Sequence, residues 1–249
     1  MKVITFSSIK GGTGKSSLSI LTSNYLSKVG YKVLCIDLDI QNSFTFYHFP
    51  ENTESNKNIF NALITENLKD NIIKDLFISM IPSSFNLVKA RSLNPKTLLR
   101  LRNQIESDFD YCVIDTAPTF DNLVLNALNF SDIIITPCYL SNFDFKALDF
   151  YRNMIGLETD KKDNWKVILN RYRPPKSDNS ESELNQYIDL FQNNFNNILE
   201  SKINETAYIQ KAIDTKIQIT KAKHKEKLYF SVSNFIKELL NIDAIPEQF

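Results

Sequence analysis

Glycine is scarce in this sequence of 249 residues, and its few positions are informative. The chain has 5 glycines, a share of roughly 2% where about 7% is usual. Three of them, Gly11, Gly12 and Gly14, lie within four residues of one another. Because glycine adopts backbone conformations that other residues avoid, this cluster marks a segment with special backbone requirements.

Cysteine is also rare, and its pattern excludes several kinds of site. The 3 cysteines, Cys35, Cys112 and Cys138, each lie in an apolar run with strand character. Their number is odd, and their spacing matches neither a disulfide framework nor a zinc site. We expect buried free thiols in a reducing compartment.

The sequence lacks long hydrophobic runs and an excess of either charge. No apolar run approaches the roughly 18 residues of a membrane-spanning helix. The short apolar run after Lys2 ends at Lys10, unlike the core of a signal peptide. Basic and acidic residues number 29 each, which argues against a protein wholly devoted to nucleic acid but allows a local basic patch. We expect a cytoplasmic protein.

Short apolar runs alternate with segments of helical periodicity along the whole chain. Runs that are apolar on both faces are typical of central strands in a parallel sheet. Their alternation with helices predicts an α/β fold, with a mostly parallel twisted sheet and helices on both faces. No polar segment is long enough to be a convincing linker, so we expect a single domain over residues 1–249. The expected strands are residues 3–9, 32–38, 76–81, 111–114, 133–136, 167–169 and 198–203, and the expected helices are 18–29, 58–69, 97–107, 122–130, 144–155, 181–196 and 226–241.

The glycine cluster lies between the first expected strand and the first expected helix. It reads Ile9-Lys10-Gly11-Gly12-Thr13-Gly14-Lys15-Ser16-Ser17. Glycines there let successive N–H groups form an anion-binding nest at a helix N-terminus. Lys15 can reach the β- and γ-phosphates of a nucleotide, and the Ser16 hydroxyl can bind Mg²⁺. The segment predicts a phosphate-binding loop, although Ile9 stands where the strict P-loop pattern has glycine.

Two other expected strands end in acidic residues. Asp37 and Asp39 lie at the end of one run and point to the same side of the sheet by strand alternation. Asp115 follows another, and an unpaired carboxylate buried there would be costly. The carboxyl ends of parallel strands are where α/β sheets bind ligands. These carboxylates are candidate magnesium and catalytic groups, or one of them merely caps the turn that follows.

Together these segments resemble the deviant Walker A, switch I and Walker B motifs of the ParA/MinD superfamily of P-loop ATPases. In that superfamily the residue at position 9 varies freely, and a second lysine, here Lys10, precedes the glycines. The resemblance covers nearly the whole chain and is to the short ParA type, without an N-terminal helix-turn-helix region. It implies a P-loop NTPase fold and an ATPase with ATP and Mg²⁺ as cofactors.

The resemblance also implies catalytic roles. Lys10 would be the signature lysine that crosses a dimer interface to the ATP of the partner subunit. Lys15 would bind the phosphates of its own subunit, and Asp39 would orient or deprotonate the attacking water. Two departures from the family's switch I pattern, Ile40 for proline and Asn42 for glycine, leave open a weakly hydrolysing nucleotide-binding scaffold.

The remaining site residues implied by the resemblance bind the metal and the base. Ser16, Asp37 and Asp115 would surround the magnesium ion. Asn170, in Ile168-Leu169-Asn170, would recognise adenine, and residues 205–209 would complete the base pocket. The expected nucleotide-binding residues are Lys10, Gly11, Gly12, Thr13, Gly14, Lys15, Ser16, Ser17 and Asn170.

The expected partners are a second copy of the chain, nonspecific DNA and a ParB-type centromere-binding protein. The ATP-bound dimer would bind the nucleoid and leave it when the partner stimulates slow hydrolysis, as in DNA segregation. Segments 86–104 and 207–227 are basic and predict a surface for DNA phosphates, or two solvated helix faces. A MinD-like positioning ATPase is the alternative, but residues 228–249 carry a net charge of −2, which argues against a membrane anchor.

Overall fold

The computed structural model describes residues 1–50, 56–76, 78–175, 178–214 and 226–241. The strands are β1 (Lys2–Phe6), β2 (Val33–Leu38), β3 (Ile78–Ile81), β4 (Tyr111–Thr116), β5 (Ile133–Cys138), β6 (Trp165–Tyr172) and β7 (Ile198–Asn204). The α-helices are α1 (Lys15–Lys28), α2 (Ser43–His48), α3 (Ile59–Ile64), α4 (Thr97–Arg100), α5 (Asn122–Phe130), α6 (Asn142–Glu158), α7 (Asp178–Asn194), α8 (Ala207–Asp214) and α9 (Glu226–Leu240). Short 3₁₀ helices are η2 (Lys69–Asn71), η3 (Phe85–Ala90), η4 (Arg102–Gln104) and η5 (Lys162–Asn164).

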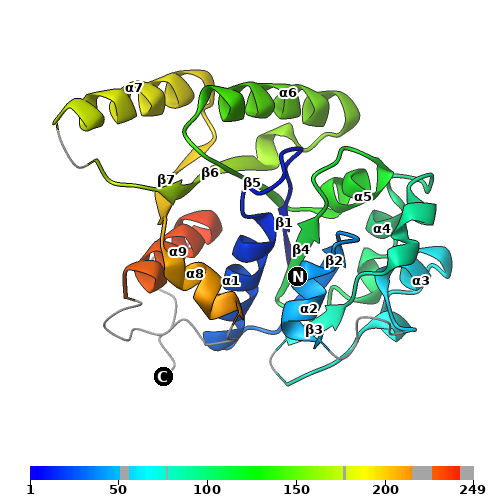
Figure 1. The fold of residues 1–249 in the computed structure, drawn as a ribbon. Helices are drawn as coiled ribbons and strands as arrows, with labels where there is room; N and C mark the ends of the chain where they lie inside the picture. Colours follow the sequence, from blue (N-terminus) through cyan, green and yellow to red (C-terminus); the bar gives the residue numbers. More distant parts are fainter. Residues whose placement is uncertain (51–55, 77, 176–177, 215–225, 242–249) are drawn as a thin grey trace.

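The described strands form one parallel sheet with the order β3-β2-β4-β1-β5-β6-β7. Helices cover both faces, with α1, α8 and α9 on one and α3 to α7 on the other (Figure 1). This arrangement confirms the predicted α/β fold. Because β1 lies between β4 and β5, the loop that follows β1 leaves the middle of the sheet. Ligands bind at such central crevices in open α/β sheets.

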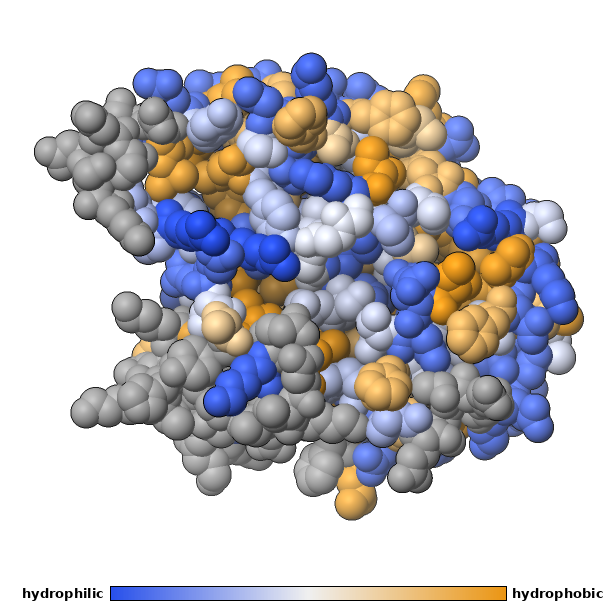
Figure 2. All heavy atoms as spheres, in the orientation of Figure 1, coloured by the Kyte–Doolittle hydropathy of each residue, from blue (hydrophilic) through white to orange (hydrophobic). Residues whose placement is uncertain are grey.

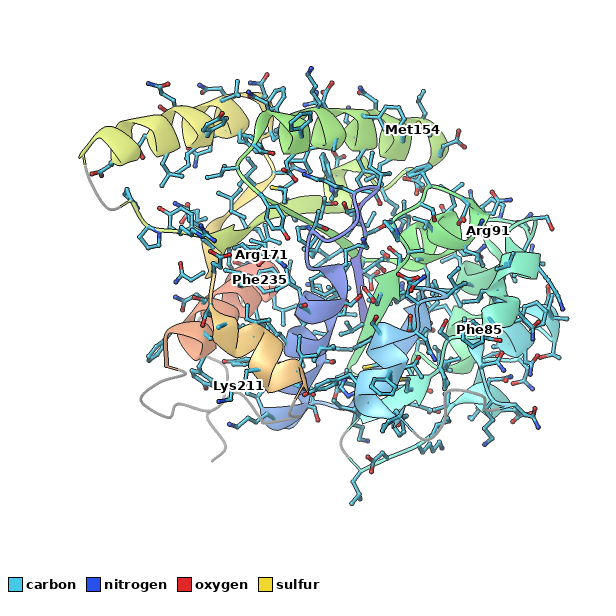
Figure 3. The ribbon with its side chains drawn as sticks, in the orientation of Figure 1. Phe85, Arg91, Met154, Arg171, Lys211 and Phe235 are labelled. Carbon is cyan, nitrogen blue, oxygen red and sulfur yellow. The ribbon has the colours of Figure 1, made fainter. Side chains whose placement is uncertain are left out.

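Strand alternation decides which core each side chain enters. On β2, Val33 and Cys35 pack under α1 and α9, whereas Leu34 and Ile36 pack against α3 and α5. Both sets are fully buried, which explains why this strand reads as a continuous apolar run. On the α9 side, Phe235 meets Phe6 of β1 with ring centroids 6.4 Å apart (Figure 3).

The first helix begins at the glycine cluster and is held by the core on one side. Leu18, Leu21 and Leu26 of α1 are buried against the sheet. Gly30, at φ +98°, ends the helix with the left-handed conformation expected of a C-terminal glycine. The helix N-terminus is therefore fixed above the centre of the sheet.

The helix predicted over residues 97–107 is wrong in its length. The α-helix stops after four residues and continues as the 3₁₀ turn η4. Arg102 explains the break, because its guanidinium bonds to Asp132 at 2.8 Å and to the Met1 carbonyl at 3.0 Å. These tertiary bonds fix the chain direction more strongly than helix propensity does.

The helix predicted over residues 58–69 also divides. Its first part is α3, and Glu66 at φ +51° turns the chain before η2 begins. Two helices, α2 and α8, are not among the helices expected from periodicity, although a solvated helix face was one interpretation of the segment that contains α8. Both are eight residues or shorter, so they show too little periodicity to be recognised. Among the described residues, no helix has both the length and the apolar character needed to cross a membrane.

Candidate nucleotide-binding site

The loop between β1 and α1 has the backbone of an anion-binding nest. Gly12 and Gly14 adopt φ of +74° and +99°, which residues with a Cβ rarely adopt. Gly14 is also the N-cap of α1, so the loop leads directly into the positive end of the helix dipole. A Cβ at Gly14 would collide with Nδ2 of Asn170. The positive φ and this close approach of Asn170 together favour glycine at this position.

Lys15 is the cation of the loop. Its side chain is buried, and its Nζ donates to the Lys10 carbonyl at 3.4 Å. Burial lowers the pKa of Lys15, and the nearby Asp115 and Asp39 carboxylates oppose this shift. Because this ammonium is already buried, it can bind phosphate oxygens without a further cost of desolvation.

Asp115 lies fully buried at the end of β4. The Ser19 hydroxyl donates to its Oδ1 at 3.2 Å, and its Oδ2 has no hydrogen-bond partner among the described residues. Burial and the neighbouring Asp37 carboxylate together raise the pKa of Asp115 to about 8, although Ser16 and Lys15 oppose the shift. An unsatisfied buried carboxylate oxygen beside the Ser16 hydroxyl suits a hydrated magnesium ion.

The oxygen ligands near Oδ2 of Asp115 also fit magnesium better than a metal ion that is bound by protein side chains alone. In the part of the chain that the structure describes, no group of three or more His, Cys, Asp and Glu side chains could hold a metal. Magnesium keeps several waters and binds through one or two carboxylates together with substrate phosphates. Ser16 and Asp115 are the residues that fit it.

Asp37 pairs in register with Asp115 on the neighbouring strand. Its Oδ1 accepts from the Asp39 N–H at 3.0 Å, and its Oδ2 accepts from the Thr45 N–H and hydroxyl, each at 2.9 Å. Burial raises the pKa of Asp37 to about 7, although these bonds oppose the shift. Asp37 therefore holds the loop between β2 and α2, and its place near the magnesium shell stays a prediction.

Asp39 begins the loop that resembles switch I. Its Oδ1 accepts from the Gln41 N–H at 2.9 Å, so this carboxylate does cap the following turn. Its carbonyl accepts from the Ser83 hydroxyl at 2.6 Å. Asn42 has φ +60°, a conformation that asparagine tolerates better than most residues. Asn42 can therefore take the place of glycine in this loop.

Lys10 is paired within its own chain. Its Nζ lies 2.7 Å from Oδ2 of Asp144 and 5.8 Å from the centre of the Tyr139 ring. The Ser141 hydroxyl, which caps α6, also donates to Asp144. The Asp144 side chain is 2% exposed, whereas that of Lys10 is 36% exposed. Lys10 can thus turn toward solvent, but only by leaving a buried carboxylate.

Asn170 ends the buried part of β6 below the loop. Its Nδ2 donates to the Thr13 carbonyl at 2.8 Å, and its Oδ1 accepts from the Arg171 N–H at 2.9 Å. These bonds leave one N–H and one lone pair for a base. Asn170 also lines a pocket of about 470 Å³ with Gly14, Ser17, Leu18, Arg171, Glu205, Thr206, Ala207 and Ile209.

The pocket has the position expected of a base pocket beside a phosphate loop. It joins the loop to the start of α8, where the sequence resemblance placed residues 205–209. Figure 3 shows Arg171 between the layer of α6 and α7 and the layer of α8 and α9, and Figure 2 shows strongly hydrophilic side chains beside a hollow there. Recognition of adenine by Asn170 stays a prediction.

The structure also reveals site residues that the sequence reading missed. Ser19 carries a weak signal, because it lies one helical turn after Lys15 and thus faces the same strand end. Thr45, Ser83, Tyr139 and Asp144 carry none, since each reaches the site from a separate loop or helix start. Only the tertiary fold brings them to the nucleotide site.

The basic segment 86–104 is less available to DNA than its sequence suggests. Arg91 pairs with Asp121 at 3.4 Å, and Arg100 pairs with Glu66 at 3.2 Å. Arg102 is held by Asp132. Lys89 and Lys96 lie in the same segment on exposed positions. In segment 207–227, Lys211 is exposed on α8, whereas Lys216, Lys221, Lys223 and Lys225 and the side chain of Lys227 lie outside the described residues.

Comparison with known proteins gives consistent matches. The family described as an AAA domain matches residues 1–167. The sporulation initiation inhibitor protein Soj of Bacillus subtilis is 27% identical over 165 residues, which are 63% of this chain and 65% of Soj. A virulence plasmid ParA family protein of Chlamydia psittaci is 23% identical over 258 aligned positions, which cover 97% of this chain and 95% of that protein.

Solved structures agree with these sequence matches. A plasmid partition protein from Borrelia burgdorferi B31, bound to AMPPNP, is 27% identical with a TM-score of 0.75, and the match covers 95% of this chain and 98% of that one. An ATP complex of a Cyanothece McdA variant shares the fold, with a TM-score of 0.83 at 19% identity over 99% of both chains. The chain therefore belongs to the AAA domain family, and within it to the ParA-type ATPases of the ParA/MinD superfamily of P-loop ATPases.

Proposed function

We propose that the protein is a magnesium-dependent ATPase that acts as a DNA-binding switch in the segregation or positioning of a cargo. The observation that carries this proposal is the meeting of three groups at one strand edge: the glycine nest, the buried Lys15 and the unsatisfied Oδ2 of Asp115. The relatives named as plasmid partition and ParA family proteins support the segregation role.

Each site residue has a distinct task in this proposal. The nest and Lys15 bind the phosphates, while Ser16 and Asp115 hold the magnesium ion. Magnesium, when bound, supplies positive charge to the phosphates as they separate. Asp39 lies close enough to Lys15 to influence its pKa, and its second oxygen remains available to accept a proton from water. In this proposal one subunit supplies all of these groups, and a second copy of the chain adds its signature lysine, Lys10.

Lys10 connects hydrolysis to dimerisation. In the single subunit it neutralises Asp144, so the signature lysine has a partner before a second subunit arrives. Dimerisation would exchange this ion pair for one with the phosphates of the partner subunit's ATP. The left-handed Asn42 supports an intact switch I, which favours the hydrolysing switch over the weakly hydrolysing scaffold.

The dimer would bind DNA and release it on hydrolysis. Two subunits present twice the number of lysines to one duplex, so that dimerisation strengthens weak phosphate contacts. A ParB-type partner would stimulate hydrolysis and thereby cause release. The bound nucleotide would thus decide whether the protein resides on the nucleoid.

The direct test is retention of the protein on nonspecific DNA with ATP and Mg²⁺, with ADP, or without nucleotide. We expect the wild type to be retained only with ATP and Lys10→Ala to be lost in every condition. Lys162→Ala, which removes an exposed lysine at the opposite end of β6, serves as the matched control and should behave as the wild type. Equal retention in all nucleotide states would refute the switch.

If the wild type is not retained on DNA even with ATP and Mg²⁺, the DNA-binding part of the proposal is also contradicted. Sedimentation with anionic liposomes would then show whether the protein is a MinD-like positioning ATPase. Hydrolysis of ATP measured in the same samples separates this outcome from loss of the ATPase itself.

A further inference from the structure

The carbonyl groups of the phosphate loop are held by side chains from two distant segments. The Tyr139 hydroxyl, in the loop between β5 and α6, donates to the Gly12 carbonyl. Nδ2 of Asn170, at the end of β6, donates to the next carbonyl, that of Thr13, at 2.8 Å. Two consecutive peptide groups of the nest are therefore tied to the sheet edge from outside.

Peptide geometry converts these bonds into an orientation of the nest. In a planar trans peptide the C=O and the following N–H point in opposite directions. A donor that holds the Gly12 carbonyl thus turns the Thr13 N–H to the other side of the loop. The bond to the Thr13 carbonyl does the same for the Gly14 N–H. These are N–H groups that a phosphate nest needs to present.

We propose that Tyr139 is a positioning residue for phosphate binding, acting together with Asn170 to orient the nest before the nucleotide arrives. The proposal rests on the proposed function, since it assigns new residues to the same site. It also gives Asn170 a second task besides its predicted contact with adenine. Neither task excludes the other, because Asn170 keeps one N–H for a base.

The ring of Tyr139 adds a second contribution. Lys10 Nζ lies 5.8 Å from the ring centre, and the Arg171 guanidinium carbon lies 5.4 Å from it. Both distances are within the range of cation–π attraction. One half-buried aromatic ring therefore packs against both side chains beside the glycine nest, where the Arg171 charge favours an incoming phosphate.

The conservative change Tyr139→Phe distinguishes the contribution of the hydroxyl from that of the ring. It removes the bond to the Gly12 carbonyl and keeps both cation–π contacts. We expect the dissociation constants of fluorescent ATP and ADP analogues to rise by about 3- to 10-fold, as loss of one hydrogen bond predicts. The preference for ATP over GTP should stay unchanged, because the hydroxyl acts on phosphates and not on the base.

Two comparisons make the result decisive. Tyr187→Phe removes a hydroxyl from α7, outside the site, and should leave nucleotide affinity unchanged. Tyr139→Leu removes the ring as well, and should weaken ATP binding further than Tyr139→Phe does. The melting temperature of nucleotide-free Tyr139→Phe should lie within about 1 °C of the wild type, because the bond is exposed and water can replace the hydroxyl as the donor to the Gly12 carbonyl.

Unchanged affinity in Tyr139→Phe would overturn the proposal. A fall in the melting temperature of the nucleotide-free variant that accounts for its weaker binding would overturn it too, because Tyr139 would then act on the fold as a whole. A wild-type protein that binds neither nucleotide would instead contradict the proposed function. The two failures are therefore distinguishable in one set of titrations.

Discussion

At the scale of single residues, the site contains two buried carboxylates on neighbouring strands, Asp37 on β2 and Asp115 on β4. Burial raises both pKa values, to about 7 and about 8. A carboxyl group whose pKa is higher in the folded than in the unfolded state makes the fold less stable as pH rises. The nucleotide-free protein should therefore lose stability between about pH 4 and pH 8, the window between the two states' values.

Asp115→Asn should make the nucleotide-free protein more stable at pH 8. The amide cannot ionise, so the cost of a buried charge disappears, and each 1 kcal/mol gained raises the melting temperature by about 2–4 °C. At pH 5 the difference should be much smaller, because the folded carboxyl is protonated and pH 5 lies near the lower end of this window. Thermal unfolding at both pH values measures this change.

The matched control is Asp163→Asn, an exposed aspartate on η5, which should change the melting temperature at neither pH. ATP hydrolysis by Asp115→Asn should be lost, because the variant removes a magnesium ligand. A melting temperature that falls at pH 8 would contradict the inference that burial of this carboxylate destabilises the fold.

The same residues show what the sequence could predict about the site. Gly12, Gly14, Lys15 and Asp115 were found because they form short motifs at a strand end. Asp144 could not be found, since 134 residues separate it from Lys10 and an Asp in the first turn of a helix is common. A sequence motif cannot predict a residue's role when that role depends on a contact between distant segments.

At the element scale, the starts of α5 and α6 are fixed by side-chain caps. Asp121 is the N-cap of α5 and accepts from the Leu123 and Val124 N–H groups at 3.1 and 3.2 Å. It also pairs with the partly exposed Arg91, which adds little in solvent. The helix follows β4, so its start helps to hold the loop after Asp115.

Asp121→Ala should destabilise the protein by about 1 kcal/mol, the usual cost of losing a cap. The melting temperature should fall by about 2–4 °C. Asp121→Asn is the matched control, because asparagine caps a helix nearly as well and should restore most of the stability. If both variants lose the same stability, the ion pair with Arg91 rather than the cap is responsible.

Element boundaries were the less predictable part of the fold. The strands were recognised because burial on both faces makes them continuously apolar. The helix expected over residues 97–107 failed because Arg102 bonds to Asp132 and the Met1 carbonyl, which no local pattern reveals. Helical periodicity records which face is apolar, but tertiary bonds decide where the helix stops.

At the scale of the whole molecule, the zero net charge makes DNA binding depend on local arrangement. Ion pairs already occupy Arg91, Arg100 and Arg102. Lys89 and Lys96 remain as exposed cations of that segment. We therefore expect lysines rather than arginines to make the phosphate contacts.

Salt dependence tests this expectation for the ATP-bound dimer. With about three contacts per subunit, a dimer makes about six, and affinity should fall by roughly a thousandfold between 50 and 200 mM salt. Lys96→Ala removes one contact from each subunit, so the negative slope of log affinity against log salt should become shallower by about 2. Filter binding with ATP and Mg²⁺ measures both slopes.

Lys162→Ala provides the control for this measurement, because it removes an equal charge from η5, outside both basic segments. It should shift neither the affinity nor the slope. A flat salt response of the wild type would contradict binding through phosphates altogether. A third outcome is that the wild type shows the expected slope while Lys96→Ala leaves that slope unchanged. In that case the DNA surface would lie at the lysines of segment 207–227, and dimerisation would combine those lysines rather than Lys89 and Lys96.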